Sequence, residues 1–462
     1  MHYVSTRGQS PALTFDQAMM TGLARDGGLY VPEHVPQLSA AQIAAMAGLS
    51  YEDTALRVIR PFLGEAFTSE ELVPLIAAAY GGFVHPARAP LVQLAPGHFL
   101  LELFHGPTLA FKDFAMQLLG QLMQAALARS GQRITIVGAT SGDTGSAAIE
   151  AFRGLTNVDV FIMYPHGRVS EVQRRQMTTP TESNVHALAM DGDFDDCQAR
   201  LKDMFNDHGF RDQVALAGVN SINWARVLAQ VVYYFSAAVA LGAPHRPVSF
   251  TVPTGNFGDV FAGYVARRMG LPIAQLVVAT NHNDILHRTL ATGSQRKVGV
   301  TASISPSMDI QVSSNFERVL FDAYGRDGAV VAAQMAALND DGGFDLGQGA
   351  WAFLKQHFES GTASEEQTRA TIARTLAVTG ELLCPHSAVG VHVAAQHLGP
   401  VPMVTLATAH PAKFPDAVQA ATGIRPPLPP RMADLYDRAE RVTRVANDLS
   451  ALTSLILERR RS

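Results

Sequence analysis

The sequence predicts an α/β fold with mainly parallel sheets, preceded by a mostly helical N-terminal part. From residue 101 onward one pattern recurs: an apolar β-rich run, then a polar or glycine-rich loop, then a helical run. Strands that alternate with helices in this way are typical of parallel sheets with helices on both faces. Residues 1–90 instead show helical periodicity, as in residues 14–23 and 51–63.

Composition indicates a globular protein with a large core. The 462 residues are 47% hydrophobic and 17% charged, with a formal net charge of -5, so no basic field favours nucleic acid as a partner. The length suggests two or three domains. Cys197 and Cys384 are too few for a disulfide framework or a structural zinc site, and we expect both to be small buried hydrophobes.

No targeting or membrane segment is predicted. Residues 1–15 lack the apolar core of a signal peptide and the charge pattern of a transit peptide. The longest apolar run, residues 227–241, is interrupted by Gln230 and Ser236 and is shorter than the roughly 20 residues that span a bilayer. We therefore expect a core helix there, no membrane partner, and a cytoplasmic location.

Lys112 lies in the most informative stretch, residues 101–123. An apolar run at residues 101–104 suits a buried strand, a short loop follows, and a helical pattern begins near Phe111. Phe111 and Phe114 flank the lysine, so its ammonium form is poorly hydrated and disfavoured. Such a lysine can be a neutral amine, as carbonyl chemistry requires. The ordinary alternative is a lysine that extends to solvent from the first helical turn.

A glycine-rich loop follows the predicted strand at residues 248–252. It consists of Gly255, Asn256, Phe257, Gly258 and Asp259. Glycines there allow backbone N–H groups to surround an anion, and the N-terminus of the next helix adds partial positive charge. The loop lacks the lysine of the GxxxxGK[ST] nucleotide motif. An ordinary tight turn is the alternative.

Two further loops follow predicted strands, where ligands bind in open α/β sheets. The loop at residues 139–146 carries more hydroxyl side chains than capping requires, and these can hold a carboxylate or phosphate. Thr408 follows the predicted strand at residues 403–407. Its hydroxyl can hydrogen-bond a heteroaromatic nitrogen without forcing that nitrogen to be protonated. His410, two residues later, is more often structural than catalytic.

A reactive lysine, an anion loop and a strand-end hydroxyl together describe a site for pyridoxal 5'-phosphate. Its aldehyde would join Lys112, its phosphate would lie in residues 255–259, and its ring nitrogen would face Thr408. The segments HGPTLAFKDFA, GATSGDTGSAA, PTGNFGD and LATAHPAKF, with ARDGGLYVPE near the start and NSINWARVLAQ in the middle, resemble the threonine synthase family. The resemblance extends from about residue 3 to about residue 430, with the motifs in the same order.

The resemblance implies the fold group of the tryptophan synthase β subunit. That fold has two doubly wound, mainly parallel-sheet domains with the cofactor between them. We expect a mostly helical N-terminal domain at residues 1–90 and a small α/β domain at residues 115–234. Residues 91–114 and 235–462 would form the large cofactor-binding α/β domain.

The resemblance also implies roles for individual residues. Lys112 would be the Schiff-base lysine and the catalytic acid/base, residues 255–259 the phosphate site, and Thr408 the partner of the ring nitrogen. Asp143 occupies the position where many relatives place an asparagine beside the 3'-oxygen, so a carboxylate here must share a proton with that oxygen. The expected substrate contacts are Ser141, Thr144, Asn220, Ser221, Asn223 and Arg226. Arg226 would pair with the substrate's phosphate; a helix-surface arginine is the alternative.

The family's reaction converts O-phospho-L-homoserine and water into L-threonine and phosphate. It is the last step of threonine biosynthesis, and the enzymes that carry it out are carbon–oxygen lyases acting on phosphates. A phospho-lyase that releases 2-oxobutyrate from the same substrate would carry the same motifs. A non-catalytic ligand-binding relative is disfavoured, because Lys112 and all three loops are present. We expect a small-molecule substrate, and either a monomer or a homodimer.

Overall fold

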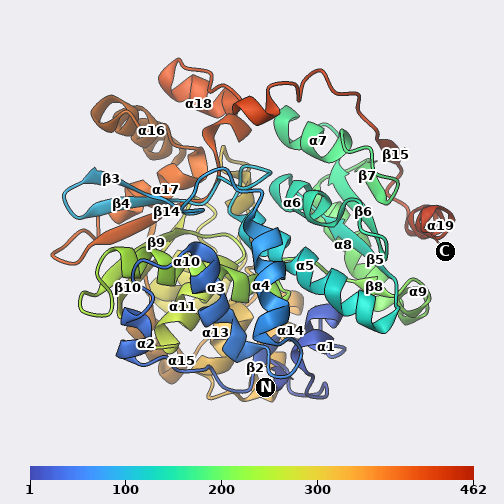
Figure 1. Ribbon diagram of the computed structural model, residues 1–462, viewed down its shortest axis with the longest axis horizontal. Coiled ribbons are helices and arrows are strands. Elements are labelled where there is room, and N and C mark those ends of the chain that lie inside the picture. Colours follow the sequence, from blue (N-terminus) through green and yellow to red (C-terminus); the bar gives the residue numbers. More distant parts are fainter. Residues whose placement is uncertain (462) are drawn as a thin grey trace.

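Two main sheets, at the left and right of Figure 1, organise the computed structural model, which describes residues 1–461. The larger sheet has the strand order β13 (Glu359–Thr362), β10 (Ile273–Thr280), β9 (Val248–Pro253), β14 (Met403–Ala407), β4 (His98–Glu102) and β3 (Leu91–Ala95). All neighbouring strands are parallel except β3 and β4. The predicted α/β class is confirmed.

Helices cover both faces of the larger sheet. Along β10 the side chains alternate: Val277 and Ala279 pack with α17 (Pro385–Ala394), whereas Leu276 and Val278 face the core shared with α10 (Trp224–Ala240) and α11 (Gly258–Arg268). A strand buried on both faces is apolar throughout, which explains the continuous apolar runs in the sequence.

The smaller sheet is entirely parallel. Its strands are β15 (Thr443–Val445), β7 (Val185–Met190), β6 (Val158–Pro165), β5 (Ile134–Ala139) and β8 (Leu216–Ala217), in that order. α5 (Lys112–Ser130) and α6 (Asp143–Phe152) lie on one side of it, and α8 (Phe194–Asn206) lies on the other.

The C-terminal segment corrects the expected division of the chain, which placed all of residues 235–462 in the large domain. β15 pairs with β7, and Leu452 and Ile456 of α19 (Leu449–Arg459) share a core with α8. The Arg461 side chain donates hydrogen bonds to Asp159 of β6 and to nearby carbonyls. Residues 443–461 therefore belong with the smaller sheet.

The N-terminal part is mostly helical, as predicted, and shares its core with the rest of the chain. It contains the antiparallel pair β1 (Tyr3–Ser5) and β2 (Tyr30–Pro32), then α1 (Phe15–Thr21), α2 (Ala40–Ala44), α3 (Tyr51–Ile59) and α4 (Ser69–Tyr80). α3 packs on α10 and α4 on α5, and the rings of Tyr3 and Trp224 lie 5.9 Å apart. This part thus buttresses the helices that carry the site.

The remaining elements surround the two sheets. They are α7 (Glu171–Thr178), α9 (His208–Gln213), α12 (Ile285–Thr292), β11 (Ser294–Arg296), α13 (Phe316–Ala323), α14 (Gly328–Asp340), β12 (Gly343–Asp345), α15 (Gln348–His357), α16 (Glu365–Thr379) and α18 (Pro415–Thr422), with short 3-10 turns that include η2 (Pro306–Met308) and η3 (Pro411–Lys413).

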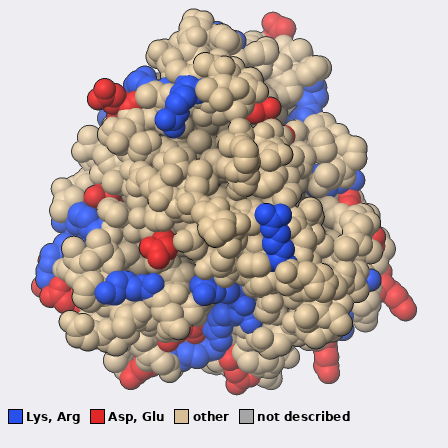
Figure 2. All heavy atoms as spheres, turned by 90° about the vertical axis from the view of Figure 1, so that its left-hand side faces the viewer, with Lys and Arg blue, Asp and Glu red and all other residues tan. Residues whose placement is uncertain are grey.

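On the face in Figure 2, basic side chains gather towards the lower part and acidic ones lie beside them.

The apolar run at residues 227–241 is a core helix, as expected. Most of α10 is buried, including Gln230, and both cysteines are buried as well. Within residues 1–461 no helix is both long and apolar enough to cross a membrane.

The sheet order brings distant loops together. β14 lies between β4 and β9, so the loops that follow these strands are neighbours at the carboxyl edge of the sheet. Main-chain hydrogen bonds connect two of them directly: Phe111 N donates to Thr408 O at 2.8 Å, and His410 N donates to Leu109 O at 3.0 Å. These main-chain hydrogen bonds therefore fix the position of Lys112 relative to Thr408.

Candidate active site

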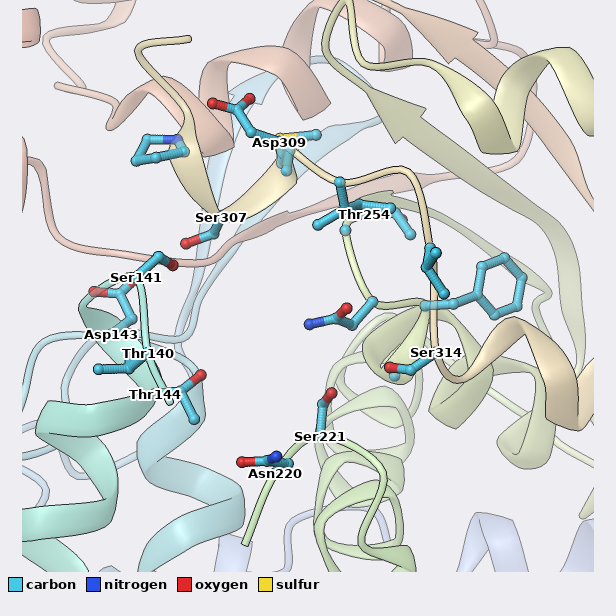
Figure 3. Close-up of a pocket in the computed structure, with 18 of the residues that line it drawn as sticks. Thr140, Ser141, Asp143, Thr144, Asn220, Ser221, Thr254, Ser307, Asp309 and Ser314 are labelled. Atoms are coloured by element: carbon cyan, nitrogen blue, oxygen red, sulfur yellow. The ribbon is translucent and has the colours of Figure 1, made fainter. Parts of the chain in front are cut away.

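A cavity of about 540 Å³ lies between the carboxyl edges of the two sheets. Figure 3 shows Ser141, Asp143 and Thr144 on one side, Thr254 and Ser314 on the other, and Asn220 and Ser221 between them. The N-termini of α5, α6 and α11 all line the cavity. Each helix N-terminus carries partial positive charge, so together they favour an anionic ligand.

The loop at residues 255–259 presents free backbone donors to this cavity. Among residues 1–461, none accepts a hydrogen bond from the N–H groups of residues 255–259. The first N–H groups of any helix lack an intrahelical partner, and here the free donors of residues 255–259 line the cavity, an arrangement that suits an anion.

Two buried side chains of this loop, Phe257 and Asp259, fix its shape. Phe257 adopts a positive φ of 61° while its ring packs on Phe316 and Phe358, with centroid separations of 5.1 and 5.4 Å. The Asp259 carboxylate accepts hydrogen bonds from the hydroxyls of Tyr233 and Tyr234. Burial raises the pKa of Asp259 to about 6 despite these bonds. The loop therefore offers its backbone to a ligand, while the Phe257 and Asp259 side chains hold it in place.

Lys112 is the first residue of α5 and is nearly buried, with 9% of its surface exposed. Its Nζ lies 4.6 Å from the centroid of the Phe111 ring and 3.5 Å from Asp143 Oδ2. Burial lowers the pKa of Lys112, although the nearby Asp143 carboxylate opposes this shift. Phe114, expected to flank the lysine, packs instead on Phe83 in the core. Of Phe111 and Phe114, only Phe111 contacts the Lys112 amine.

Asp143 begins α6 and is completely surrounded by donors. Its Oδ1 lies 2.8 Å from Lys413 Nζ and accepts a 2.9 Å hydrogen bond from Gln173 Nε2, while Oδ2 faces Lys112. Burial alone would raise the pKa of Asp143, but Lys413 and Lys112 hold it well below its usual range. Asp143 is therefore ionised at neutral pH.

The hydroxyls of the 139–146 loop fall into two groups. Thr140 Oγ1 accepts hydrogen bonds from the N–H groups of Gly142 and Gly145, and Ser146 Oγ donates to carbonyls in its own helix. Ser141 and Thr144 line the cavity, and their hydroxyls make no hydrogen bond within residues 1–461. The first group shapes the loop, and the second is available to a ligand.

The segment before α10 contributes Asn220, Ser221 and Arg226 to the cavity wall. Asn223 does not line it, contrary to the sequence-based expectation. Its side chain caps α10: Oδ1 accepts from Ala225 N, and Nδ2 donates to the carbonyls of Met19 and Gly218. With all these bonds made, Asn223 has a structural role.

Arg226 is 3% exposed and incompletely paired. Its Nη1 donates to Val219 O at 3.1 Å, while the buried Nε has no partner and no carboxylate within residues 1–461 forms an ion pair with it. Burial lowers the pKa of Arg226 to about 10, which leaves it charged at neutral pH. A buried cation on a cavity wall without a counter-ion indicates an anionic ligand. The helix-surface alternative is wrong.

Thr408 is 5% exposed and lines the cavity. Its backbone N–H donates to Ser387 Oγ at 3.1 Å, but its hydroxyl has no hydrogen-bond partner among residues 1–461. His410 has the structural role expected for it, because its Nδ1 accepts a hydrogen bond from Ala412 N. The Thr408 hydroxyl is thus free to meet a ligand.

Several residues in or near the cavity had no role in the sequence-based prediction. Ser307 and Asp309 form a wall, and Asp309 is held by the side-chain amides of Asn281 and Asn283. Asn315 Nδ2 donates to the carbonyls of Ser221 and Asn256 and so connects two site loops. Lys413 lies in the motif LATAHPAKF, which assigned it no role.

These residues fit pyridoxal phosphate on three observations. The loop of free N–H groups suits a phosphate, the nearly buried Lys112 amine suits an aldehyde, and the free Thr408 hydroxyl suits a ring nitrogen. An added Cβ at Gly255 would lie 2.4 Å from Ser307 O, so only glycine permits the loop to lie against that wall.

Comparisons with known proteins show which family the chain resembles. Residues 2–80 match the family model described as threonine synthase N terminus, residues 85–339 that of pyridoxal-phosphate dependent enzymes, and residues 387–456 that of the threonine synthase C-terminal region. The threonine synthase of Pseudomonas aeruginosa is 54% identical over 459 residues, which cover 99% of this chain and 98% of that protein.

Solved structures show the same similarity. The crystal structure of pyridoxal phosphate-bound threonine synthase from Brucella melitensis superposes with a TM-score of 0.97 at 56% identity and covers 100% of both chains. The yeast threonine synthase structure gives a TM-score of 0.93 at 39% identity, covering 99% of this chain and 98% of that one. With high identity along the full length of both chains, the protein belongs to the threonine synthase family.

Proposed function

We propose that this cavity carries out the family's reaction, the conversion of O-phospho-L-homoserine and water into L-threonine and phosphate. The observation that supports this most strongly is the nearly buried Lys112 amine in a cavity that also holds the free N–H groups of residues 255–259. Bound pyridoxal phosphate supplies an electron sink for carbanions at Cα and Cβ of the substrate. Everything else the reaction needs must come from the chain.

Lys112 is the acid/base of the site in this proposal. Of the two lysines near Asp143, it lines the cavity, whereas Lys413 is completely buried. Its amine removes the proton from substrate Cα and then the proton from Cβ, as phosphate leaves Cγ. Protons are then returned to Cγ, which becomes the methyl group, and to Cα, while water adds at Cβ. Asp143 is too strongly held by Lys413 and Gln173 to act as a base.

The other residues bind and orient the substrate. The free hydroxyls of Ser141 and Thr144, at the N-terminus of α6, suit the substrate's carboxylate. Arg226, with Asn220 and Ser221 beside it on the cavity wall, suits the substrate's phosphate. These assignments place the substrate's carboxylate beside Ser141 and Thr144 and its phosphate beside Asn220 and Ser221 (Figure 3).

Arg226→Met should raise the KM for O-phosphohomoserine by about 100-fold, because one charged hydrogen-bonding group to phosphate contributes roughly 1.5–3 kcal/mol. Inhibition by inorganic phosphate should weaken in parallel, and Arg226→Lys should recover only part of both, since an ammonium lacks the planar fork. Steady-state kinetics with phosphate as inhibitor measures this. Phosphate inhibition equal to that of the unmodified enzyme would remove Arg226 from the phosphate site.

Thr408→Asp should change the products rather than the fold. A carboxylate there favours a protonated ring nitrogen and strengthens the electron sink, so we expect slower threonine release, new long-wavelength absorbance with substrate, and more 2-oxobutyrate. Thr408→Ser should resemble the unmodified enzyme more closely than Thr408→Val does. If spectrum and product ratio stay unchanged in Thr408→Asp, the residue only ends its strand.

Product analysis tests the function directly. Purified enzyme with O-phosphohomoserine should release threonine and phosphate in equal amounts, measured by chromatography and a phosphate assay. Release of 2-oxobutyrate as the main product would instead support the phospho-lyase. We also propose a cytoplasmic location and a monomer or homodimer in solution, for which cell fractionation and sedimentation are the measurements.

A further inference from the structure

Two lysines share one buried carboxylate at the end of the cavity. Lys413 Nζ lies 2.8 Å from Asp143 Oδ1 and donates a second 2.8 Å hydrogen bond to Thr108 O. Lys112 Nζ lies 3.5 Å from the other oxygen, Oδ2. Lys413 has no exposed surface, so its charge is fully removed from water.

This arrangement presents a chemical problem for the proposed function. Lys112 must be a neutral amine to bond an aldehyde, yet a buried carboxylate nearby favours an ammonium. If Asp143 had Lys112 as its sole cation, the pair would hold the proton on Lys112. A second cation that neutralises Asp143 removes this attraction.

We propose that Lys413 is a positioning residue that takes up the negative charge of Asp143 and thereby keeps the Lys112 amine neutral. The proposal rests on the proposed function, because it concerns the lysine that bonds the cofactor. It gives a role to a buried side chain that does not line the cavity.

The hydrogen-bond geometry places the proton on Lys413. An ammonium requires acceptors, and Lys413 has two at 2.8 Å, whereas the contact of Lys112 is longer than an ordinary hydrogen bond. Gln173 fixes the arrangement from a third side. Its Oε1 accepts from Ser170 N in a capping box, so its Nε2 must be the group that donates to Asp143 Oδ1.

Three further ionisable groups face Lys112, and they do not reverse this conclusion. The charge of Arg226 also disfavours an ammonium on Lys112. His386 is neutral, since its Nε2 accepts from Ser307 N and burial lowers its pKa to about 4. The Asp259 carboxylate is bonded to two tyrosine hydroxyls. Asp143 is therefore the main group that favours the charged form, and Lys413 is the group that neutralises it.

The test measures the pH dependence with which Lys112 reacts. The full chain, freed of cofactor, is mixed with pyridoxal phosphate between pH 6 and pH 10. Lys112 Nζ bonds the aldehyde carbon, water leaves, and borohydride reduces the C=N bond. Mass spectrometry of the peptide that carries Lys112 then gives the labelled fraction. The titration of pyridoxal phosphate itself is common to all variants, so differences in midpoint report the amine.

In Lys413→Met the midpoint should rise by at least about one pH unit, a tenfold loss of labelling on the acidic side. In Asp143→Asn the midpoint should fall. In the variant that combines Lys413→Met with Asp143→Asn, the midpoint should return to that of the unmodified protein or lie below it. Opposite shifts of this kind are not produced by a general loss of packing. Lys413→Arg, which keeps the charge, should stay close to the unmodified midpoint.

Lys297→Met is the matched control, because it removes one charge from the cavity wall without contacting Asp143, and its midpoint should not move. An unchanged midpoint in Lys413→Met, with or without a lower melting temperature, overturns the proposal. If Lys413→Met does not fold, an Asp143→Asn midpoint that fails to fall overturns it instead. Absence of labelling at Lys112 in the unmodified chain at every pH would refute the proposed function itself.

Discussion

Lys112→Ala should lower kcat by at least about 10⁴-fold, because in the proposed function Lys112 is both the amine that holds the cofactor and the group that moves protons. The visible absorption of bound cofactor should disappear with it. The fold should persist, since Asp143 keeps its contacts with Lys413 and Gln173, and no core residue is changed. The melting temperature of the cofactor-free variant should lie within about 3 °C of the unmodified protein.

Kinetics, absorption spectra and thermal unfolding of the same preparation measure this. Lys355→Ala on α15 is the control, since this lysine is exposed and packs over the Trp351 ring at 3.9 Å, apart from the cavity. Turnover of Lys112→Ala within tenfold of the unmodified enzyme would show that another group carries the chemistry.

Gly255→Val should weaken pyridoxal phosphate binding by at least about 100-fold, or roughly 2.7 kcal/mol, the size of one or two charged hydrogen bonds. The new Cβ would lie 2.4 Å from Ser307 O, so loop and wall must separate and the free N–H groups lose their alignment. The melting temperature of the cofactor-free variant should fall by only a few degrees, because Ser307, the residue that the new Cβ displaces, lines the cavity and is only part-buried.

Two glycine variants calibrate this result. Gly258→Ala, whose Cβ would lie 3.3 Å from Asn315 Nδ2, should have a smaller effect on affinity. Gly349→Ala has no atom within 4 Å of the new Cβ and should leave affinity unchanged. Equilibrium titration of the cofactor-free chains gives the affinities. A large fall in melting temperature with unchanged affinity would make residues 255–259 a structural turn only.

Local patterns in the sequence predicted the parts of the site that depend on local structure. The glycine-rich loop, Lys112 at a helix start and Thr408 at a strand end each follow from a strand, a loop and a helix in succession. The structure places all three in one cavity because parallel strands end at the same edge of a sheet.

The contacts that the sequence did not predict join residues far apart in the chain. Lys413 looks like any surface lysine in its own segment, and only the tertiary structure reveals its ion pair with Asp143. Asn223 did carry a local signal, since asparagine directly before a helical run is a preferred N-cap. β15 has three residues, which are too few to show the alternating apolar and polar pattern of a strand. Its pairing with β7 could therefore not be predicted from the sequence.

The place of β14 in the larger sheet has a consequence for biosynthesis of the chain. β14 ends at residue 407 but lies between β4 and β9, which are complete by residue 253. At roughly 5–20 residues per second, the ribosome needs about 8–30 s to make the intervening segment. During this interval β4 and β9 each lack their shared neighbour, and open strand edges favour aggregation. Thr408, which follows β14, joins the other cavity residues only after this interval.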